Sequence, residues 1–225
     1  MTEKELRDSG KLYKPFGCEE LRAEYVRAGK LVFKLNSLPP SGSEERRAVM
    51  HSLFGSMGKK CTIIPSFHCD LGYNIHIGDN FFANTGLVIL DTAPVNIGNN
   101  VLIGPQVGIY AAYHPLDVAT RIAGYEAAKP VTICDDVWIG GHVSILPGVT
   151  IGRGAVIGAA AWLRTAFRPE LWQPGILAGL SKSPPPPTTR GSRKTNNMHI
   201  KTAWHSFFNQ TPVNSSTLYF QAVKP

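Results

Sequence analysis

The residue of this sequence best suited to proton transfer is His114, in the segment Tyr113-His114-Pro115-Leu116-Asp117. The unperturbed pKa of imidazole lies near neutrality, so a histidine can accept a proton from a substrate hydroxyl and return it at physiological pH. A lone histidine is more often structural or simply exposed. His114, however, stands where a regular sequence repeat is interrupted, and such insertions tend to carry function. It is therefore a candidate general base.

Other polar and aromatic residues stand close to the same repeat. Asn84 occupies a turn position that glycine usually fills, Asp70 and Asp91 adjoin apolar repeat positions, and Trp138 follows the segment that contains His114. Polar side chains outside the repeat but on neighbouring coils can converge on one outer groove, so these residues are candidates for a binding site. Two simpler interpretations stay open: Asp91 could only satisfy backbone amides, and Trp138 could only pack at a subunit contact.

The element that must position these residues is predicted from an apolar residue at every sixth position between Leu71 and Ala159. The series reads Leu71, Ile77, Ala83 and Ile89, then Ile97, Ile103 and Ile109, then Ile133, Ile139, Ile145, Ile151 and Ile157. A period of six fits neither a helix nor a single strand. It is typical of a parallel β-helix, in which about 18 residues form one three-sided coil and the apolar side chains stack inside.

Two irregular spacings interrupt this register. Ile89 and Ile97 are eight residues apart, which predicts a two-residue bulge around Asp91-Thr92. Ile109 and Ile133 are 24 residues apart, and the segment 110–130 lacks the repeat. The second spacing predicts a loop that leaves the prism next to His114.

The chain divides into an N-terminal helical segment at 1–58, a β-helix at 59–159 and a tail at 160–225. After a polar lead-in, the pattern predicts a helix from Glu19 to Ala28, closed by Gly29, and a second helix from Glu44 to Phe54. We expect these helices to cover the open first coil. The first helical region is predicted to extend over Leu31–Leu38, and Ser41 or Ser43 is predicted to cap the second helix. The tail, which contains the run SPPPPTT at 183–189, is predicted to be disordered.

The distribution of charge along the chain limits which kinds of partner the folded part can bind. Residues 160–225 hold eight Lys and Arg against one acid, whereas residues 1–159 hold 15 of each, so the basic pI belongs to the tail. A nucleic-acid role for the folded part thus loses its main support. The sequence has neither a run of 18 apolar residues nor a signal-like N-terminus, and its four cysteines lack metal-ligand spacing. We expect a cytoplasmic protein without membrane or metal.

Seven segments and the lead-in carry a resemblance to a known family. They are N-F-F-A-N (80–84), I-L-D (89–91), I-G-P-Q-V (103–107), Y-H-P-L-D (113–117), K-P-V-T-I (129–133), D-D-V-W-I-G-G (135–141), I-L-P-G-V-T-I-G (145–152) and K-L-Y (11–13). Their order and spacing over residues 10–159 resemble the maltose/galactoside O-acetyltransferases. The resemblance implies a left-handed β-helix, a homotrimer, and acetyl-CoA lying between neighbouring prisms.

The resemblance also implies roles for individual residues. His114 matches the catalytic base, and Glu126 falls near it on the loop, although it could instead be solvated. The acceptor-side positions match Asp70, Asn84, Asp91 and Thr92, and the cofactor positions match Trp138 and the backbone at Gly141 and Ala159. The family's N-terminal acidic ligand is not clearly placed, because residues 14–18 depart from the pattern and leave only Glu19 or Glu20.

The resemblance stops after Ala159. When residues 160–182 are translated back into codons and these are read in a shifted frame, they can encode the C-terminal sequence that is usual in the family. That sequence closes the last coil and holds the CoA phosphates. We therefore interpret residues from about 160 on as read out of frame, with a genuine disordered tail as the alternative. The nucleotide sequence decides between them.

These patterns predict an acetyl-CoA-dependent O-acetyltransferase that acts on a sugar such as maltose, glucose or a galactoside. An alternative is a protein that is not an active enzyme, namely a catalytically impaired scaffold that lacks the CoA-binding ending. Calorimetry would then detect no binding of CoA. A third is a zinc hydratase, which needs His68, His76 and His114 to converge. We expect His76 and His142 to be structural or to face a neighbouring subunit.

Overall fold

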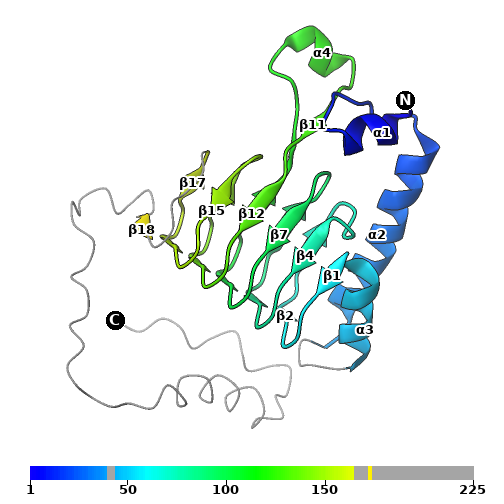
Figure 1. Cartoon of the computed structure of the whole chain (residues 1–225). Helices are drawn as coiled ribbons and strands as arrows, with labels where there is room; N and C mark the ends of the chain where they lie inside the picture. Colours follow the sequence, from blue (N-terminus) through cyan, green and yellow to red (C-terminus); the bar gives the residue numbers. More distant parts are fainter. Residues whose placement is uncertain (40–43, 165–171, 174–225) are drawn as a thin grey trace, which may run out of the picture. The chain divides into compact units, whose positions relative to one another are not determined.

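The computed structural model describes residues 1–39, 44–164 and 172–173, which all belong to one compact unit, Met1–Pro184. Most of the unit is a three-sided parallel β-helix (Figure 1). Face 1 contains β1 (Ser56–Met57), β4 (Ile75–Ile77), β7 (Val95–Ile97), β12 (Val131–Ile133) and β15 (Thr150–Ile151). Face 2 contains β2 (Thr62–Ile63), β5 (Phe82–Ala83), β8 (Leu102–Ile103), β13 (Trp138–Ile139), β16 (Val156–Ile157) and β18 (Trp172–Gln173). Face 3 contains β3 (Phe67–Cys69), β6 (Leu87–Leu90), β9 (Gly108–Tyr110), β14 (Ser144–Ile145) and β17 (Trp162–Leu163).

The six-residue period sets which side chains form the core. On face 1, Ile77 pairs with Ile97, Ile97 with Ile133, and Ile133 with Ile151, and all are buried. The residues between them on each strand point outward, as the alternation of a β-strand requires. The prediction of a coil-stacked apolar core is confirmed.

The corner between faces 3 and 1, which we call the 3/1 corner, is enlarged in two coils rather than one. Inward residues on either side of it, Ile89 and Ile97, are eight residues apart, as the sequence predicts. The same spacing separates Cys69 from Ile77, because Cys69 and not Leu71 pairs with Ile89. Placing Leu71 in the strand register was therefore wrong. Leu71 is fully buried within the corner, and both enlarged corners carry an aspartate.

The predicted loop at 110–130 is an arm that projects from the 3/1 corner (Figure 1). Its stem is an antiparallel pair of strands, β10 (Ala112–Tyr113) and β11 (Ala127–Ala128). Its tip is the short helix α4 (Val118–Ile122), whose N-terminal amides are capped by the Asp117 carboxylate through Thr120 N at 2.8 Å. His114 directly follows the outgoing strand of the stem.

Three helices precede the coils. Helix α1 (Glu3–Asp8) was not predicted, although Thr2 and Glu5 form a capping box that the sequence displays. Helix α2 (Glu19–Ser37) does not end at Gly29 and includes the predicted extension from Leu31 as far as Ser37, because Val32 and Leu35 are buried against the core. That burial outweighs the cost of about 1 kcal/mol for glycine within a helix. Helix α3 (Glu44–Leu53) matches its prediction, and the proposed caps Ser41 and Ser43 lie outside the described residues.

The repeat continues beyond Ala159. Leu163 follows Ile157 by six residues, is buried, and pairs with Ile145. Strand β18 extends face 2 by pairing with β16. The predicted boundary at 159 thus falls short by one hexapeptide, whereas the remaining predictions for 160–225, the disorder and the change of frame, fall mainly on residues that are not described. Among the described helices, none is long and apolar enough to cross a membrane.

Candidate active site

His114 is held between two residues of the returning part of the arm. Its Nδ1 lies 3.4 Å from the Tyr125 carbonyl oxygen, and its Nε2 lies 3.8 Å from Glu126 Oε1. A carbonyl can only accept a hydrogen bond, so the first contact favours a proton on Nδ1 and leaves the lone pair on Nε2. The side chain is 57% exposed. A free imidazole nitrogen is thus presented to solvent beside a carboxylate.

Glu126 is anchored and not merely solvated. Its side chain is only 15% exposed, and Oε2 accepts a hydrogen bond of 3.0 Å from the Tyr13 hydroxyl. The main chains of these two residues also pair, with N···O distances of 3.0 and 2.9 Å. One carboxylate oxygen is therefore occupied, while the other faces His114.

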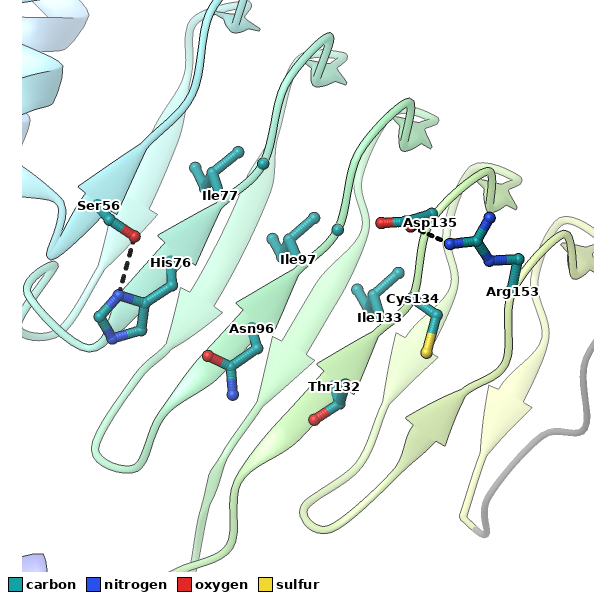
Figure 2. Close-up of a pocket in the computed structure, with 12 residues that line it drawn as sticks. Ser56, His76, Ile77, Asn96, Ile97, Thr132, Ile133, Cys134, Asp135 and Arg153 are labelled. Carbon is teal, nitrogen blue, oxygen red and sulfur yellow. Dashed lines mark hydrogen bonds and ion pairs between the residues drawn. The ribbon is translucent and has the colours of Figure 1, made fainter.

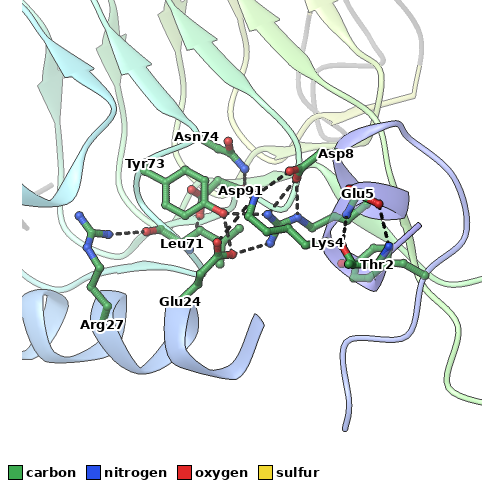
Figure 3. Close-up of polar contacts among 12 residues, drawn as sticks. Thr2, Lys4, Glu5, Asp8, Glu24, Arg27, Leu71, Tyr73, Asn74 and Asp91 are labelled. Atoms are coloured by element: carbon green, nitrogen blue, oxygen red, sulfur yellow. Dashed lines mark hydrogen bonds and ion pairs between the residues drawn. The ribbon is translucent and has the colours of Figure 1, made fainter. Parts of the chain in front are cut away.

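Asp91 fills the second enlarged 3/1 corner. It is fully buried, and its Oδ1 accepts hydrogen bonds from the backbone amides of Asp70 and Leu71 at 3.0 and 2.9 Å (Figure 3). Asn74 Nδ2 donates to the Asp91 carbonyl oxygen at 2.8 Å. Burial raises the pKa of Asp91. The contacts give Asp91 a role in shaping the corner, and Thr92 beside it is only 3% exposed, so neither side chain is presented to solvent.

Asp70, in the first enlarged 3/1 corner, is half-buried and senses the charge of Glu126. Burial, and then the charges of Asp91 and Glu126, raise the pKa of Asp70 to about 7. Burial and the charges of Asp70 and Glu126 also raise the pKa of Tyr25 on helix α2, so its hydroxyl stays a donor. His114, Glu126, Asp70 and Tyr25 thus combine a base, two carboxyl groups and a hydroxyl. Such groups can recognise a polyhydroxyl ligand.

The raised pKa of Asp70 gives a testable dependence of stability on pH. The folded protein binds this proton more tightly than the unfolded chain, whose value is 3.8, so stability declines as pH rises from about 4 to about 7. We expect Asp70→Asn to raise the unfolding temperature at pH 8, with the gain vanishing below about pH 4. Differential scanning calorimetry across this range measures it.

Asp117→Asn is the matched control. Hydrogen bonds from Thr120 lower the pKa of Asp117, so its contribution to stability is present at pH 8 and is lost as pH falls. The substitution should bring no gain at pH 8. A gain for Asp70→Asn that does not change with pH would contradict the account.

The candidate cofactor residues, together with the acceptor-side candidate Asn84, gather at a different corner, between faces 2 and 3, which we call the 2/3 corner. Asn84 follows β5, Trp138 lies in β13, and Gly141 and Ala159 follow β13 and β16. The Trp138 side chain is 55% exposed. A Cβ added to Gly140 would lie 2.6 Å from the Ala159 nitrogen, so the stacked turns leave no room for a side chain at position 140. Backbone that is bare at this point, beside an exposed indole, can accommodate the narrow arm of a thioester cofactor.

The two groups of residues do not meet within one chain. The 2/3 corner and the 3/1 corner lie on the two edges of face 3, with a full strand of each coil between them. The structure therefore brings Asp70, Glu126 and His114 together and leaves Asn84, Trp138, Gly141 and Ala159 apart from them.

The zinc alternative is wrong. His68 lies on β3 of face 3, His76 on β4 of face 1 and His114 on the arm, so the three histidines come from different elements. Within residues 1–39 and 44–164, no three His, Cys, Asp or Glu side chains are arranged to hold a metal ion.

A groove of about 530 Å³ runs along face 1 and contains none of the candidate catalytic, acceptor or cofactor residues (Figure 2). His76 Nδ1 lies 3.1 Å from Ser56 Oγ there, and Arg153 pairs with Asp135. These contacts agree with a structural role for His76.

The N-terminal candidates also differ from expectation. Glu19 and Glu20 are exposed at the start of helix α2, and Glu19 pairs with Arg22. Glu24, one turn on, is instead tied to the buried Arg7 at 2.8 Å (Figure 3). The residue that sequence reasoning missed is Tyr13. Its signal was weak: one of two aromatic residues in the polar lead-in, at the end of the K-L-Y motif.

Comparisons with known proteins agree with this geometry. Residues 8–58 match the maltose acetyltransferase hexapeptide capping motif, and residues 130–165 match the bacterial transferase hexapeptide family of six repeats. A Saccharomyces cerevisiae relative is 55% identical over 126 residues, which cover 56% of this chain and 64% of the relative. The galactoside O-acetyltransferase of Escherichia coli is 38% identical over 75% of this chain and 82% of its own length.

A solved structure extends the comparison to the cofactor. A hexapeptide-repeat-containing acetyltransferase of Vibrio cholerae O1 biovar eltor, complexed with acetyl coenzyme A, superposes with a TM-score of 0.71 at 39% identity. The match covers 78% of this chain and 94% of that one. This chain belongs to the hexapeptide-repeat acetyltransferases of the maltose/galactoside O-acetyltransferase group. Its fold is accordingly the left-handed parallel β-helix of that family.

Proposed function

We propose that this protein transfers the acetyl group of acetyl-CoA to a hydroxyl of a sugar such as maltose, glucose or a galactoside. The observation that carries the proposal is His114, whose Nε2 is left free by the Tyr125 carbonyl and lies 3.8 Å from Glu126. The carboxyl groups of Glu126 and Asp70 at the same corner suit a ligand rich in hydroxyls. The Escherichia coli relative is a galactoside O-acetyltransferase, which supports a sugar acceptor.

Acetyl-CoA supplies an activated acetyl thioester when it is bound. His114 Nε2 accepts the proton of the acceptor hydroxyl as the hydroxyl oxygen adds to the acetyl carbonyl carbon, which turns the carbonyl oxygen into an oxyanion. The carbon–sulfur bond breaks when this oxyanion forms the carbonyl again. The imidazolium then returns the proton to the departing sulfur. The negative charge of Glu126 beside Nε2 stabilises the imidazolium during the step. Backbone amides are well suited to stabilise the oxyanion, a role that is typically worth about 3 kcal/mol.

We propose that the complete site forms between two copies in a homotrimer. In this assembly the 3/1 corner of one copy, with Asp70 and His114, meets the 2/3 corner of the next, with Asn84 and Trp138. The separation of these corners across face 3 supports the arrangement. Gly141 and Ala159 then hold the cofactor through their backbone, and Thr92 and Asp91 shape the acceptor side from within.

The proposal is tested by incubating the full chain with acetyl-CoA and a panel of sugars and polyols, and recording thiol release. We expect release above the acceptor-free background with at least one sugar. Release only with amine acceptors would point to N-acetyl transfer and contradict the proposal.

A further inference from the structure

The lead-in residues Tyr13 and Lys14 form a strap across the arm. Tyr13 pairs with Glu126 through both main-chain hydrogen bonds and through its hydroxyl. The Lys14 ammonium lies 4.6 Å from the centre of the Tyr125 ring, within the range of a cation–π contact. Two adjacent residues of the strap therefore hold two adjacent residues of the arm, although more than 100 positions separate them in the sequence.

The two strapped residues are those that face His114. The Tyr125 carbonyl oxygen lies 3.4 Å from Nδ1, and Glu126 Oε1 lies 3.8 Å from Nε2. His114 itself is exposed, and the arm that carries it is a two-stranded stem with a short helix. A two-stranded hairpin is marginally stable on its own, so the stem needs a further support to fix the imidazole.

The strap is itself firmly attached. The Tyr13 ring is fully buried, and the backbone nitrogen of Lys14 donates to Glu3 on helix α1 at 2.6 Å. Burial and the neighbouring charges raise the pKa of Tyr13, so its hydroxyl stays protonated and can only donate to Glu126. Glu126 Oε2 is thereby held in place, and Oε1 is left for the imidazole.

We propose that Tyr13 is a positioning residue of the acetyl transfer: through Glu126 it fixes the partner of His114 Nε2 in the geometry that proton transfer requires. The inference rests on the proposed function. It assigns to the lead-in a role beyond covering the first coil. If this role is right, removing the Tyr13 hydroxyl should disturb the position of the His114 imidazole and leave the β-helix intact.

Tyr13→Phe tests this inference, because it keeps the buried ring and removes only the hydroxyl. We expect kcat to fall about tenfold while the KM for the sugar and for acetyl-CoA changes less than about twofold, since misplaced catalytic groups slow the chemical step. Tyr73→Phe is the matched control. Its hydroxyl also donates to a glutamate, Glu24, at 2.7 Å, but it contacts neither the strap nor the arm. Its kcat should stay within about twofold of the wild type.

Two further measurements separate positioning from a loss of stability. In the Glu126→Ala background, Tyr13→Phe should lower kcat further by less than about twofold, because the Tyr13 hydroxyl acts through the Glu126 carboxylate. The imidazole resonances of His114 should move in Tyr13→Phe and stay in place in Tyr73→Phe, and this readout does not depend on turnover.

The outcomes distinguish the inference from the proposed function. An active wild type with an unchanged kcat in Tyr13→Phe overturns the inference alone, as does a full tenfold loss in the Glu126→Ala background. A wild type that transfers acetyl groups to no hydroxyl acceptor overturns the proposed function and the role of Tyr13 with it.

Discussion

Replacing His114 by alanine is expected to lower kcat by about 10² to 10⁴, the usual contribution of a general base. No other residue at this corner places an unprotonated nitrogen beside a carboxylate, within the part of the chain that the structure describes. The side chain is 57% exposed and takes no part in the core, so the unfolding temperature should change little. Steady-state kinetics and thermal unfolding on the same preparation measure both effects.

The matched control is His51→Ala, which removes an exposed histidine from helix α3, remote in sequence and fold from the arm. It should leave kcat unchanged. His114→Ala with turnover near that of the wild type would show that another group takes the proton.

The second prediction with a large effect concerns Asn84 and the proposal that two neighbouring copies share one active site. Asn84 lies on the 2/3 corner and His114 on the arm at the 3/1 corner. Asn84 Oδ1 accepts from the Thr85 amide at 2.8 Å, so the amide NH₂ is the group that can donate to a ligand. Asn84→Ala should therefore lower kcat by at least about tenfold, because it removes a group that orients the reactants.

Coexpression of the two variants should restore activity if neighbouring copies share the site. In randomly mixed trimers, half of the sites receive an intact His114 and half of these an intact Asn84, so about one quarter of the wild-type activity is expected. Separately purified and unmixed variants provide the background. Mixed trimers that are no more active than this background would place both residues in a site within one copy.

The faces of the prism were predictable because the signal for them is repeated. Each hexapeptide from Ile97 to Ile109 and from Ile133 to Ile157 repeats the same inward position, so a single irregular residue cannot hide the register. The boundaries were less predictable. Gly29 is a common stop signal, but the burial of Val32 and Leu35 carries helix α2 through it. Leu163 keeps the period in a segment that otherwise reads as a departure from it.

Part of the candidate site was visible in the sequence, for a different reason. His114 stands beside a break in the repeat, and Asp70 directly precedes the apolar residue Leu71. Asp91 was equally visible, but whether a carboxylate binds a ligand or the backbone depends on contacts, and here it accepts from two amides. Tyr13 could not be found, because its partner Glu126 lies far away in the sequence and only the folded chain pairs them.

The rate of thiol release by the wild-type full chain, with and without a sugar acceptor, tests the central claim most directly. We predict a rate that saturates with both acetyl-CoA and the sugar, and a product that carries an acetyl ester on a hydroxyl. Release that is the same with and without every hydroxyl acceptor, from a chain that binds acetyl-CoA, would contradict the account.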